Sequence, residues 1–556
     1  MTRATRLRTL AGITAVGLAT TLATAGSAVS PRFFDDDPVW MEHDTENASA
    51  VKPIEVDLVS DLAVNIINAA APARPSRAGN INTVDEVPDS SWFTNRLGAQ
   101  PITAADVARG PDRTSGPAPG AWTVTSSKSD GVTPGFTVKD ADGRRWFLKF
   151  DPPGYRGMST GTEVAVTKLM WALGYHVPEN HIAYMRRQQL VVGSGAKFTP
   201  PGGGTRPMRA SDIDRLLARA DREPDGSYRV VASLALEGKP VGRIRFAGTR
   251  PDDPNDLVPH EDRRELRGYG VFAAWLNHVD AKAINSLDTL ITEHGRSYVR
   301  HHLIDFGSAL GSGGVGPADR WAGTQYLVDP VEIGRQLVGF GFGAPRFQRV
   351  AFEESPSIGR LPRDNTRFDP TSWKPRVPNQ AFLHARADDR FWAAQKLAAL
   401  TPDMVRAAVR AGDFRDRSSD AFLVRALLER RDATLRAYLP DVNPIADPSL
   451  DADGRLTFRN AAVDADVARR PEAYHGVWLT FDNTTGATQF LGASRSVTPY
   501  MRAPAPLPTR EGTFLRIELS STSAEHASWL EPAHAFFRLR DGGWQLVGFE
   551  RLPEPR

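Results

Sequence analysis

The sequence contains no cysteine among its 556 residues. This absence excludes disulfide bonds, catalysis by a thiol and metal sites built on cysteine ligands. An excess of one charge is also lacking, because 68 Lys and Arg residues nearly balance 66 Asp and Glu residues, for a formal net charge of +2. Beyond the first residues there is no compact run of Lys and Arg, so we expect no nucleic-acid partner.

Long hydrophobic runs are scarce as well, and the one near the N-terminus is short. Three arginines precede a mostly apolar run over residues 10–22, and Ala23-Thr24-Ala25 follows with the small-x-small form of a signal-peptidase site. We therefore expect residues 1–28 to be a signal peptide, cleaved near Ala25 or Ala28, and the protein to be exported to the periplasm or the cell exterior. An uncleaved membrane anchor is the alternative interpretation.

The length of the chain favours two or three folded units, and 41% hydrophobic residues supply enough apolar material for their cores. Changes in composition divide the chain into four regions behind the signal peptide. These are an N-terminal extension over residues 29–120, a β-rich region with an insertion over 121–260, a mainly helical region over 261–440 and a small β-rich module over 441–556. We expect the extension to wrap around a later region.

Short runs rich in β-branched and aromatic residues alternate with turn residues in the β-rich region. The strands predicted there are residues 122–125, 136–139, 144–150, 228–236 and 241–246. A helix is predicted over residues 161–173, because Ser159 and Thr160 can cap its start and Gly174 follows its end. Residues 193–207 are rich in Gly and Pro and are predicted to be an exposed loop. The later helices are predicted at residues 261–277, 389–400, 402–411 and 419–438.

Two further β-rich runs, residues 286–291 and 297–304, are separated by five residues that favour a hairpin turn centred near Gly295. Opposite residues of an antiparallel hairpin lie at equal distances along the chain from its centre, so this centre brings Asn285 opposite Asp305. An amide oxygen and a carboxylate are hard ligands of the kind that Mg²⁺ prefers. The sequence therefore predicts a metal site at these two residues.

The loop before this hairpin carries the candidate catalytic groups. Asp280 can accept a proton from an acceptor hydroxyl, and Lys282 can neutralise charge on a transferring phosphoryl group. The pattern His-x-Asp-x-Lys-x-x-Asn over residues 278–285, followed by a hairpin and Asp-Phe-Gly at 305–307, resembles the catalytic loop and metal-binding motif of the protein-kinase-like superfamily. The resemblance covers about residues 120–440.

This resemblance implies an α+β, bilobal protein-kinase-like fold with a β-rich N-lobe and a helical C-lobe, and ATP with Mg²⁺ or Mn²⁺ as cofactors. It implies that Lys149, at the end of a predicted strand, holds the α- and β-phosphates, with Glu163 on the following helix as its partner. Residues Thr160 to Glu163 also form a capping-box sequence, in which Glu163 would instead cap its own helix. Ser127 and Gly131 stand in the place of the family's phosphate-covering glycine loop.

The chain departs from the family pattern at several places. The three-glycine pattern is absent, Val279 replaces an arginine that reads an activation-loop phosphate in many regulated kinases, and no Ala-Pro-Glu element follows Asp305. In these respects the chain is more similar to atypical groups: the spore-coat CotH kinases, the HipA-type kinases and the secretory-pathway kinases of animal cells.

The expected function is that of an exported, ATP- and Mg²⁺-dependent phosphotransferase acting on a hydroxyl acceptor that the sequence does not identify. Two alternatives stay open. A kinase-like site can instead transfer AMP, and a catalytically silent kinase-like scaffold can bind a partner or a cell-envelope component through the C-terminal module.

Overall fold

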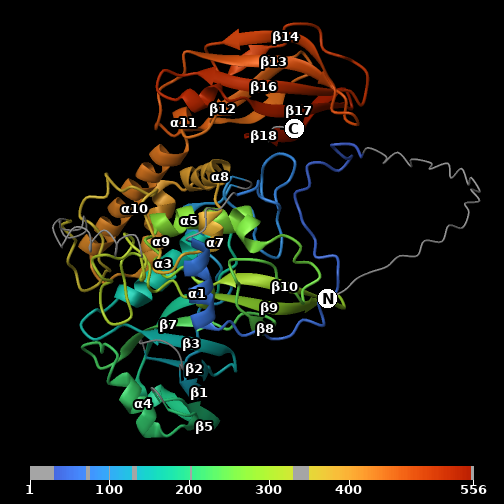
Figure 1. The fold of residues 1–556 in the computed structure, drawn as a ribbon. Helices are drawn as coiled ribbons and strands as arrows, with labels where there is room; N and C mark the ends of the chain where they lie inside the picture. The colour runs from blue at the N-terminus through green and yellow to red at the C-terminus, as the bar shows by residue number, and fades with distance from the viewer. Residues whose placement is uncertain are drawn as a thin grey trace, which may run out of the picture.

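The structure of the protein, a computed structural model, describes residues 30–69, 75–98, 101–127, 134–200, 203–329 and 350–552. The expected signal peptide with its cleavage sites near Ala25 and Ala28 lies outside these residues, and so does Gly131. None of the helices in the described ranges combines the length and the apolar character needed to cross a membrane. The described residues form a mixed α+β fold, as predicted, and contain several sheets and about ten helices (Figure 1).

The largest sheet has seven strands in the order β4-β7-β3-β2-β1-β5-β6. The strands are β1 (Trp122–Ser127), β2 (Gly135–Lys139), β3 (Arg145–Phe150), β4 (Asn180–Met185), β5 (Leu190–Phe198), β6 (Arg206–Pro207) and β7 (Tyr228–Leu234). Strands β1 and β5 are parallel, and the other neighbours in the sheet are antiparallel. Alternate residues such as Val124, Val138 and Leu148 are buried in a core that this sheet shares with helix α4 (Ala210–Leu217).

The prediction of an exposed loop over residues 193–207 is wrong, because much of this segment belongs to β5 and β6. Its glycines have a different role from the one that the composition suggested. A Cβ atom added at Gly193 would lie 2.9 Å from the carbonyl oxygen of Val124, so glycine is what lets β5 lie this close to β1.

A second, three-stranded sheet has the order β10-β9-β8. It consists of β8 (Lys239–Gly242), β9 (Ser286–Glu293) and β10 (Arg296–Leu303). The strand predicted over residues 241–246 therefore begins earlier, ends at Gly242 and pairs with β9 rather than with the large sheet.

The helices pack between the sheets. They are α3 (Met158–Ala172), α5 (Arg264–Trp275), α7 (Gln380–Leu383), α8 (Ala387–Ala398), α9 (Pro402–Gly412) and α10 (Arg417–Tyr438). Their buried faces form one large hydrophobic core, which includes Leu169, Phe272, Leu397 and Leu427. The helices predicted from hydrophobic periodicity lie within a few residues of the observed ones.

The last part of the chain forms two sheets with a core of their own. One sheet contains β11 (Ile445–Leu450), β12 (Arg455–Asn460) and β15 (Tyr500–Arg502), and the other contains β13 (Ala473–Phe481), β14 (Thr488–Ser496), β16 (Phe514–Thr522), β17 (Ala533–Arg540) and β18 (Gly543–Glu550). A short helix, α11 (Ala461–Asp464), follows β12. Figure 1 shows these sheets at one end of the molecule, the helices in the middle and the seven-stranded sheet at the other end.

The N-terminal segment contains two helices, α1 (Leu58–Ala69) and α2 (Ala104–Arg109), and contacts several parts of the molecule. Phe33 packs against Phe481, Phe514 and Phe536 of the C-terminal sheet, with ring centroids 5.1 to 6.2 Å away. Residues Ala48 and Val51 share a small core with the three-stranded sheet. The segment thus contacts both the C-terminal sheet and the three-stranded sheet.

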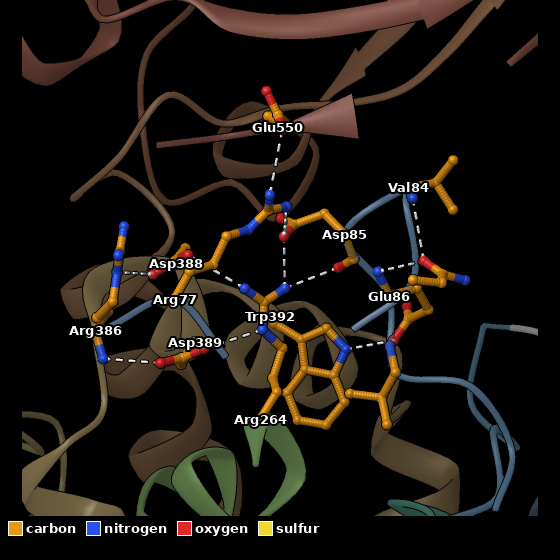
Figure 2. Close-up of polar contacts among 12 residues, drawn as sticks. Arg77, Val84, Asp85, Glu86, Arg264, Arg386, Asp388, Asp389, Trp392 and Glu550 are labelled. Atoms are coloured by element: carbon orange, nitrogen blue, oxygen red, sulfur yellow. Dashed lines mark hydrogen bonds and ion pairs between the residues drawn. The ribbon is translucent and has the colours of Figure 1, made fainter. Parts of the chain in front are cut away.

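A buried charge cluster joins this segment to the helices and to the C-terminal strands (Figure 2). The fully buried Arg264 of α5 contacts Asp85 of the segment at 2.8 Å and Asp389 of α8 at 3.0 Å. Arg77 connects Asp85 to Glu550 at the end of β18, at 3.1 and 3.4 Å. Burial alone would lower the pKa of Arg264, but the surrounding carboxylates, Asp85 first, raise it.

Candidate active site

A cavity of about 730 Å³ is lined by the seven-stranded sheet, by α3 and by the segments on either side of the β9–β10 hairpin. The predicted site residues that the structure describes all line it. They are Ser127, Lys149, Glu163, Asp280, Lys282, Asn285 and Asp305. Five segments of the chain therefore contribute polar groups to one space.

Lys149 lies at the centre of this arrangement. It is on β3, opposite Gly135 of β2 and Val231 of β7. Its ammonium lies 3.0 Å from Glu163 and 2.9 Å from Asp305. Burial alone would lower the pKa of Lys149, but the two carboxylates outweigh it and raise the pKa, so the side chain stays charged.

The carboxylate of Glu163 is directed to the cavity rather than to the start of its helix. Helix α3 begins at Met158, and the carboxylate of Asp151 accepts hydrogen bonds from the backbone N–H groups of Gly157, Ser159 and Thr160 at 2.8 to 2.9 Å. Because Asp151 satisfies these N–H groups, Glu163 is not needed as a cap. The capping-box alternative is therefore wrong, and the ion pair with Lys149 is the arrangement observed.

Glu163 also holds the segment that carries Asp305. Its two carboxylate oxygens accept hydrogen bonds from the N–H groups of Phe306 and Gly307, both at 3.0 Å. Asp305 has a φ of 61°, in the left-handed region that costs a non-glycine residue roughly 1 kcal/mol. The ring of Phe306 is buried against His278 at 5.5 Å, which helps to keep the backbone in this conformation.

On the other side of the cavity, Asp280 lies between two partners. One carboxylate oxygen is 2.7 Å from the ammonium of Lys282, and the other accepts a hydrogen bond from the amide nitrogen of Asn285 at 2.9 Å. Burial would raise the pKa of Asp280, but Lys282 and the hydrogen bonds lower it below the usual value, so this group is a carboxylate at neutral pH. The same amide nitrogen donates to the backbone oxygen of Asp280 at 2.7 Å, which leaves the amide oxygen of Asn285 as the possible metal ligand.

The predicted register of the hairpin is wrong by one residue. In the structure Glu293 pairs with Arg296 and Ser286 with Leu303, so Asn285 lies opposite Ile304, whose N–H donates to the Asn285 carbonyl at 3.0 Å. The turn has two residues, His294 and Gly295, with φ values of 50° and 79°. Such a two-residue turn moves the centre of the hairpin from Gly295 to the peptide bond between His294 and Gly295. Asn285 and Asp305 are therefore not directly opposite each other, but both line the same cavity.

Two residues near the site were not predicted from the sequence. Asn180 of β4 donates to Thr167 at 2.8 Å and to Glu163 at 3.4 Å, and thereby helps to position that carboxylate. Arg376 lines the cavity, and its backbone N–H donates to the backbone carbonyl of Val279 at 2.8 Å. Neither residue lies in a local pattern that could have revealed it, because only the packing of distant segments brings it here.

The cavity therefore combines groups that bind opposite charges. The ammonium groups of Lys149 and Lys282 can bind phosphate oxygens, whereas Asp305, with the amide oxygen of Asn285, can bind a cation. Asp280 is a base within the same space. A comparison with protein-family models gave no match, and a search of curated protein sequences gave no significant match.

Proposed function

We propose that the protein is an exported, ATP- and Mg²⁺-dependent phosphotransferase of the protein-kinase-like type that acts on a hydroxyl acceptor. The observation that carries the proposal is that Lys149, Asp280, Asn285 and Asp305 line one cavity, with Glu163 paired to Lys149. In this proposal the seven-stranded sheet with α3 is the N-lobe, and the helices from α5 to α10 belong to the C-lobe.

The nucleotide would bind between polar and apolar walls of the cavity. Lys149 would bind the α- and β-phosphates, and Ser127 would lie over them. The apolar side chains of Val231, Leu236 and Leu287 line the same cavity and fit the faces of a purine ring.

A divalent cation fits the oxygen donors of Asn285 and Asp305, which are the hard ligands that Mg²⁺ or Mn²⁺ requires. When bound, the cation would neutralise charge on the β- and γ-phosphates. Without ligands, Asp305 and Lys149 neutralise each other at 2.9 Å. When nucleotide and cation bind, the cation would become the new partner of Asp305, and the phosphates would become the new partner of Lys149.

The acceptor would approach from the side of Asp280 and Lys282. The oxygen of its hydroxyl attacks the γ-phosphorus, the bond between that phosphorus and the β–γ bridging oxygen breaks, and ADP leaves. Asp280 orients the hydroxyl and accepts its proton, and Lys282 stabilises the charge of the transferred group. Arg376, on the same wall, is in a position to contact an acceptor with a negative charge.

The direct test is incubation of the purified mature chain with ATP labelled at either the γ- or the α-phosphate, in the presence of Mg²⁺ or Mn²⁺. Transfer of the γ-label by the wild type and its loss in Asp305→Ala support the proposal. The matched control is Asp403→Ala, since this aspartate is 77% exposed on α9 and does not belong to the cavity lining. Transfer of the α-label would establish AMP transfer instead, and failure to bind nucleotide at all would favour the silent scaffold and overturn both enzymatic functions.

Export has a separate test. We expect the chain recovered outside the cytoplasm of an expressing cell to begin at residue 26 or 29, as identified by mass spectrometry of its N-terminal peptide. A chain that keeps its first residues would contradict cleavage. If the protein is exported, the C-terminal β-rich module is the part that we propose for contact with a cell-envelope component.

A further inference from the structure

A second cavity, of about 260 Å³, lies behind one wall of the candidate active site. It is formed by the segment after α3, by β10, by residues 234–237 and by Arg96 of the N-terminal segment. Leu234 and Leu236 line both cavities. The backbone N–H of Leu303, two residues before Asp305, donates to the carbonyl of His176 at 3.0 Å, so the second cavity borders the strand that leads to the site.

The lining of this cavity includes three arginines, Arg96, Arg113 and Arg300. The guanidinium of Arg96 donates to the backbone carbonyl oxygens of Trp171 and Tyr175 at 2.7 and 3.3 Å. It also lies 4.8 Å from the indole ring of Trp171, so its position is fixed by these contacts. Throughout the described part of the chain, no carboxylate is within ion-pair distance of Arg96 or Arg300.

The carboxylates of the lining do not balance these charges. Glu179 already pairs with Arg113 at 3.2 Å and accepts two hydrogen bonds from Thr114. Glu237 is exposed at the mouth. Because Arg113 pairs with Glu179, the exposed carboxylate of Glu237 is the one group left in the described lining to balance Arg96 and Arg300. The interior therefore keeps an excess of positive charge.

Two imidazoles complete the lining. One ring nitrogen of His176 faces the carbonyl of Ser90, and one of His302 faces the carbonyl of Leu287, both at 3.2 Å. Because a carbonyl oxygen only accepts hydrogen bonds, these nitrogens carry the protons when the rings are neutral. The second nitrogen of each ring is then the one that can take a proton and donate to an anion.

Burial is the main cause of the pKa shifts in this lining, and neighbouring positive groups add to it at His176. Burial lowers the pKa of Arg96 to about 10, with only Asp89 acting in the opposite direction. Burial is also the largest reason that the pKa of His176 lies well below its usual value, and the neighbouring His302 and Arg96 lower it further. An anion in the cavity would oppose each of these shifts.

We propose that this second cavity binds a small oxyanion, either inorganic phosphate or the phosphate group of a small ester, between Arg96 and Arg300. Guanidinium groups bind phosphate oxygens through two parallel hydrogen bonds, and an anion here gains two such partners that otherwise lack a carboxylate. The volume accommodates one phosphate group together with water or a small ester substituent.

The test is a calorimetric titration of the full mature chain with inorganic phosphate at constant ionic strength. Lys149→Met serves as the background, because it removes the main cationic contact for phosphate in the first cavity. We expect one saturable site in this background, and we expect Arg300→Gln to weaken its affinity by about tenfold or more. Arg296→Gln is the matched control, because Arg296 lies on the same strand but outside the cavity lining.

Thermal unfolding of each variant checks that it folds, and Arg96→Lys provides a second variant that keeps the charge but loses the planar fork. Parallel titration with glycerol phosphate distinguishes the two sources of the group, since tighter binding of either ligand identifies the preferred one. No saturable binding up to about 20 mM of either ligand would overturn the proposal, as would equal affinities in the Arg300 and Arg296 variants.

Discussion

At the scale of single residues, Lys149 connects the two sides of the candidate active site. Its ammonium contacts one carboxylate on α3 and another in the segment that follows β10. We expect Lys149→Met to reduce phosphoryl transfer by about 100-fold or more, because the main cationic contact to the nucleotide phosphates is lost. Steady-state transfer from labelled ATP measures this effect.

The control for this substitution is Lys139→Met on the neighbouring strand β2, where the side chain is exposed. This variant should transfer phosphate at the rate of the wild type. Full activity in Lys149→Met would contradict the role proposed for this residue. Thermal unfolding is measured in parallel, because the substitution leaves the carboxylates of Glu163 and Asp305 without their shared cation.

Asp280 is the proposed base. We expect Asp280→Asn to lower kcat by about 10²- to 10⁴-fold while the nucleotide affinity stays close to that of the wild type, since the amide cannot accept the proton but has nearly the same shape. Nucleotide binding by calorimetry and transfer by the labelled assay separate the two effects. Asp403→Asn is the exposed control, and an equal loss of binding and turnover would indicate a structural role for Asp280 instead.

The contact between Lys282 and Asp280 also predicts a pH effect. Burial favours the neutral form of Asp280, and the ammonium 2.7 Å away is the largest influence that lowers its pKa. Activity that requires the carboxylate is therefore present above this pKa and lost only as the pH falls below about 4. In Lys282→Ala the acid limb of the kcat profile should move to higher pH. An acid limb at the same pH as in the wild type would argue against this coupling.

At the scale of elements, the position of Glu163 depends on how closely α3 crosses α9. A Cβ atom added at Gly161 would lie 2.8 Å from the carbonyl oxygen of Gly412 and 2.9 Å from the ring of Phe414. Both are tighter than ordinary van der Waals contacts. The glycine therefore sets the distance between the helices and, two residues later, the place of the carboxylate that pairs with Lys149.

We expect Gly161→Ala to lower the free energy of unfolding by about 1 to 3 kcal/mol through overpacking, although alanine favours a helix more than glycine does by about 1 kcal/mol. Urea unfolding measures the change. The matched control is Gly204→Ala, because a Cβ atom at Gly204 would meet no other atom within 4 Å. Equal stability of the two variants would show that α3 can move away from α9 at little cost.

At the scale of the whole molecule, the buried charge cluster around Arg264 holds three parts of the chain together. Asp85 comes from the N-terminal segment, Arg264 from α5 and Glu550 from the C-terminal strands, and Arg77 connects the first to the last (Figure 2). Helix α5 leads directly into the loop that carries Asp280, so this cluster also supports the site from behind. Removing one partner of a buried guanidinium destabilises the folded protein, because the guanidinium keeps its charge.

Asp85→Asn should therefore destabilise the protein by on the order of 2 kcal/mol at neutral pH, as measured by urea unfolding. Burial opposes ionisation of Asp85, but Arg264 and Arg77 lower its pKa below the usual value in the folded state. Its stabilising contribution is thus complete above the unfolded-state pKa of about 4 and is lost as the pH falls below it. The difference between wild type and variant should shrink in acid. A difference that is unchanged at low pH would exclude this ionised pair as its cause.

Much of the fold followed from local patterns. Short runs rich in β-branched and aromatic residues, separated by turn residues, were enough to predict β2 and β3. The helices of the middle region were predicted for the same reason, since hydrophobic spacing is a property of consecutive residues. The composition of residues 193–207 was misleading, because a glycine that allows two strands to approach closely has the same local appearance as a glycine in a loop.

What the sequence by itself determined is the α+β class and the identity of the candidate residues, since both depend on residue types at short spacing. The tertiary structure alone decided that Glu163 pairs with Lys149 rather than capping α3, that Asn285 faces Ile304 across the hairpin, and that a cationic cavity lies behind the site. The physical reason is that these outcomes are competitions between partners far apart in the chain. Asp151 accepts hydrogen bonds from the N–H groups at the start of α3, and a two-residue turn sets the register of the β9–β10 hairpin. Arg96 and Arg300 line one cavity only because the chain folds.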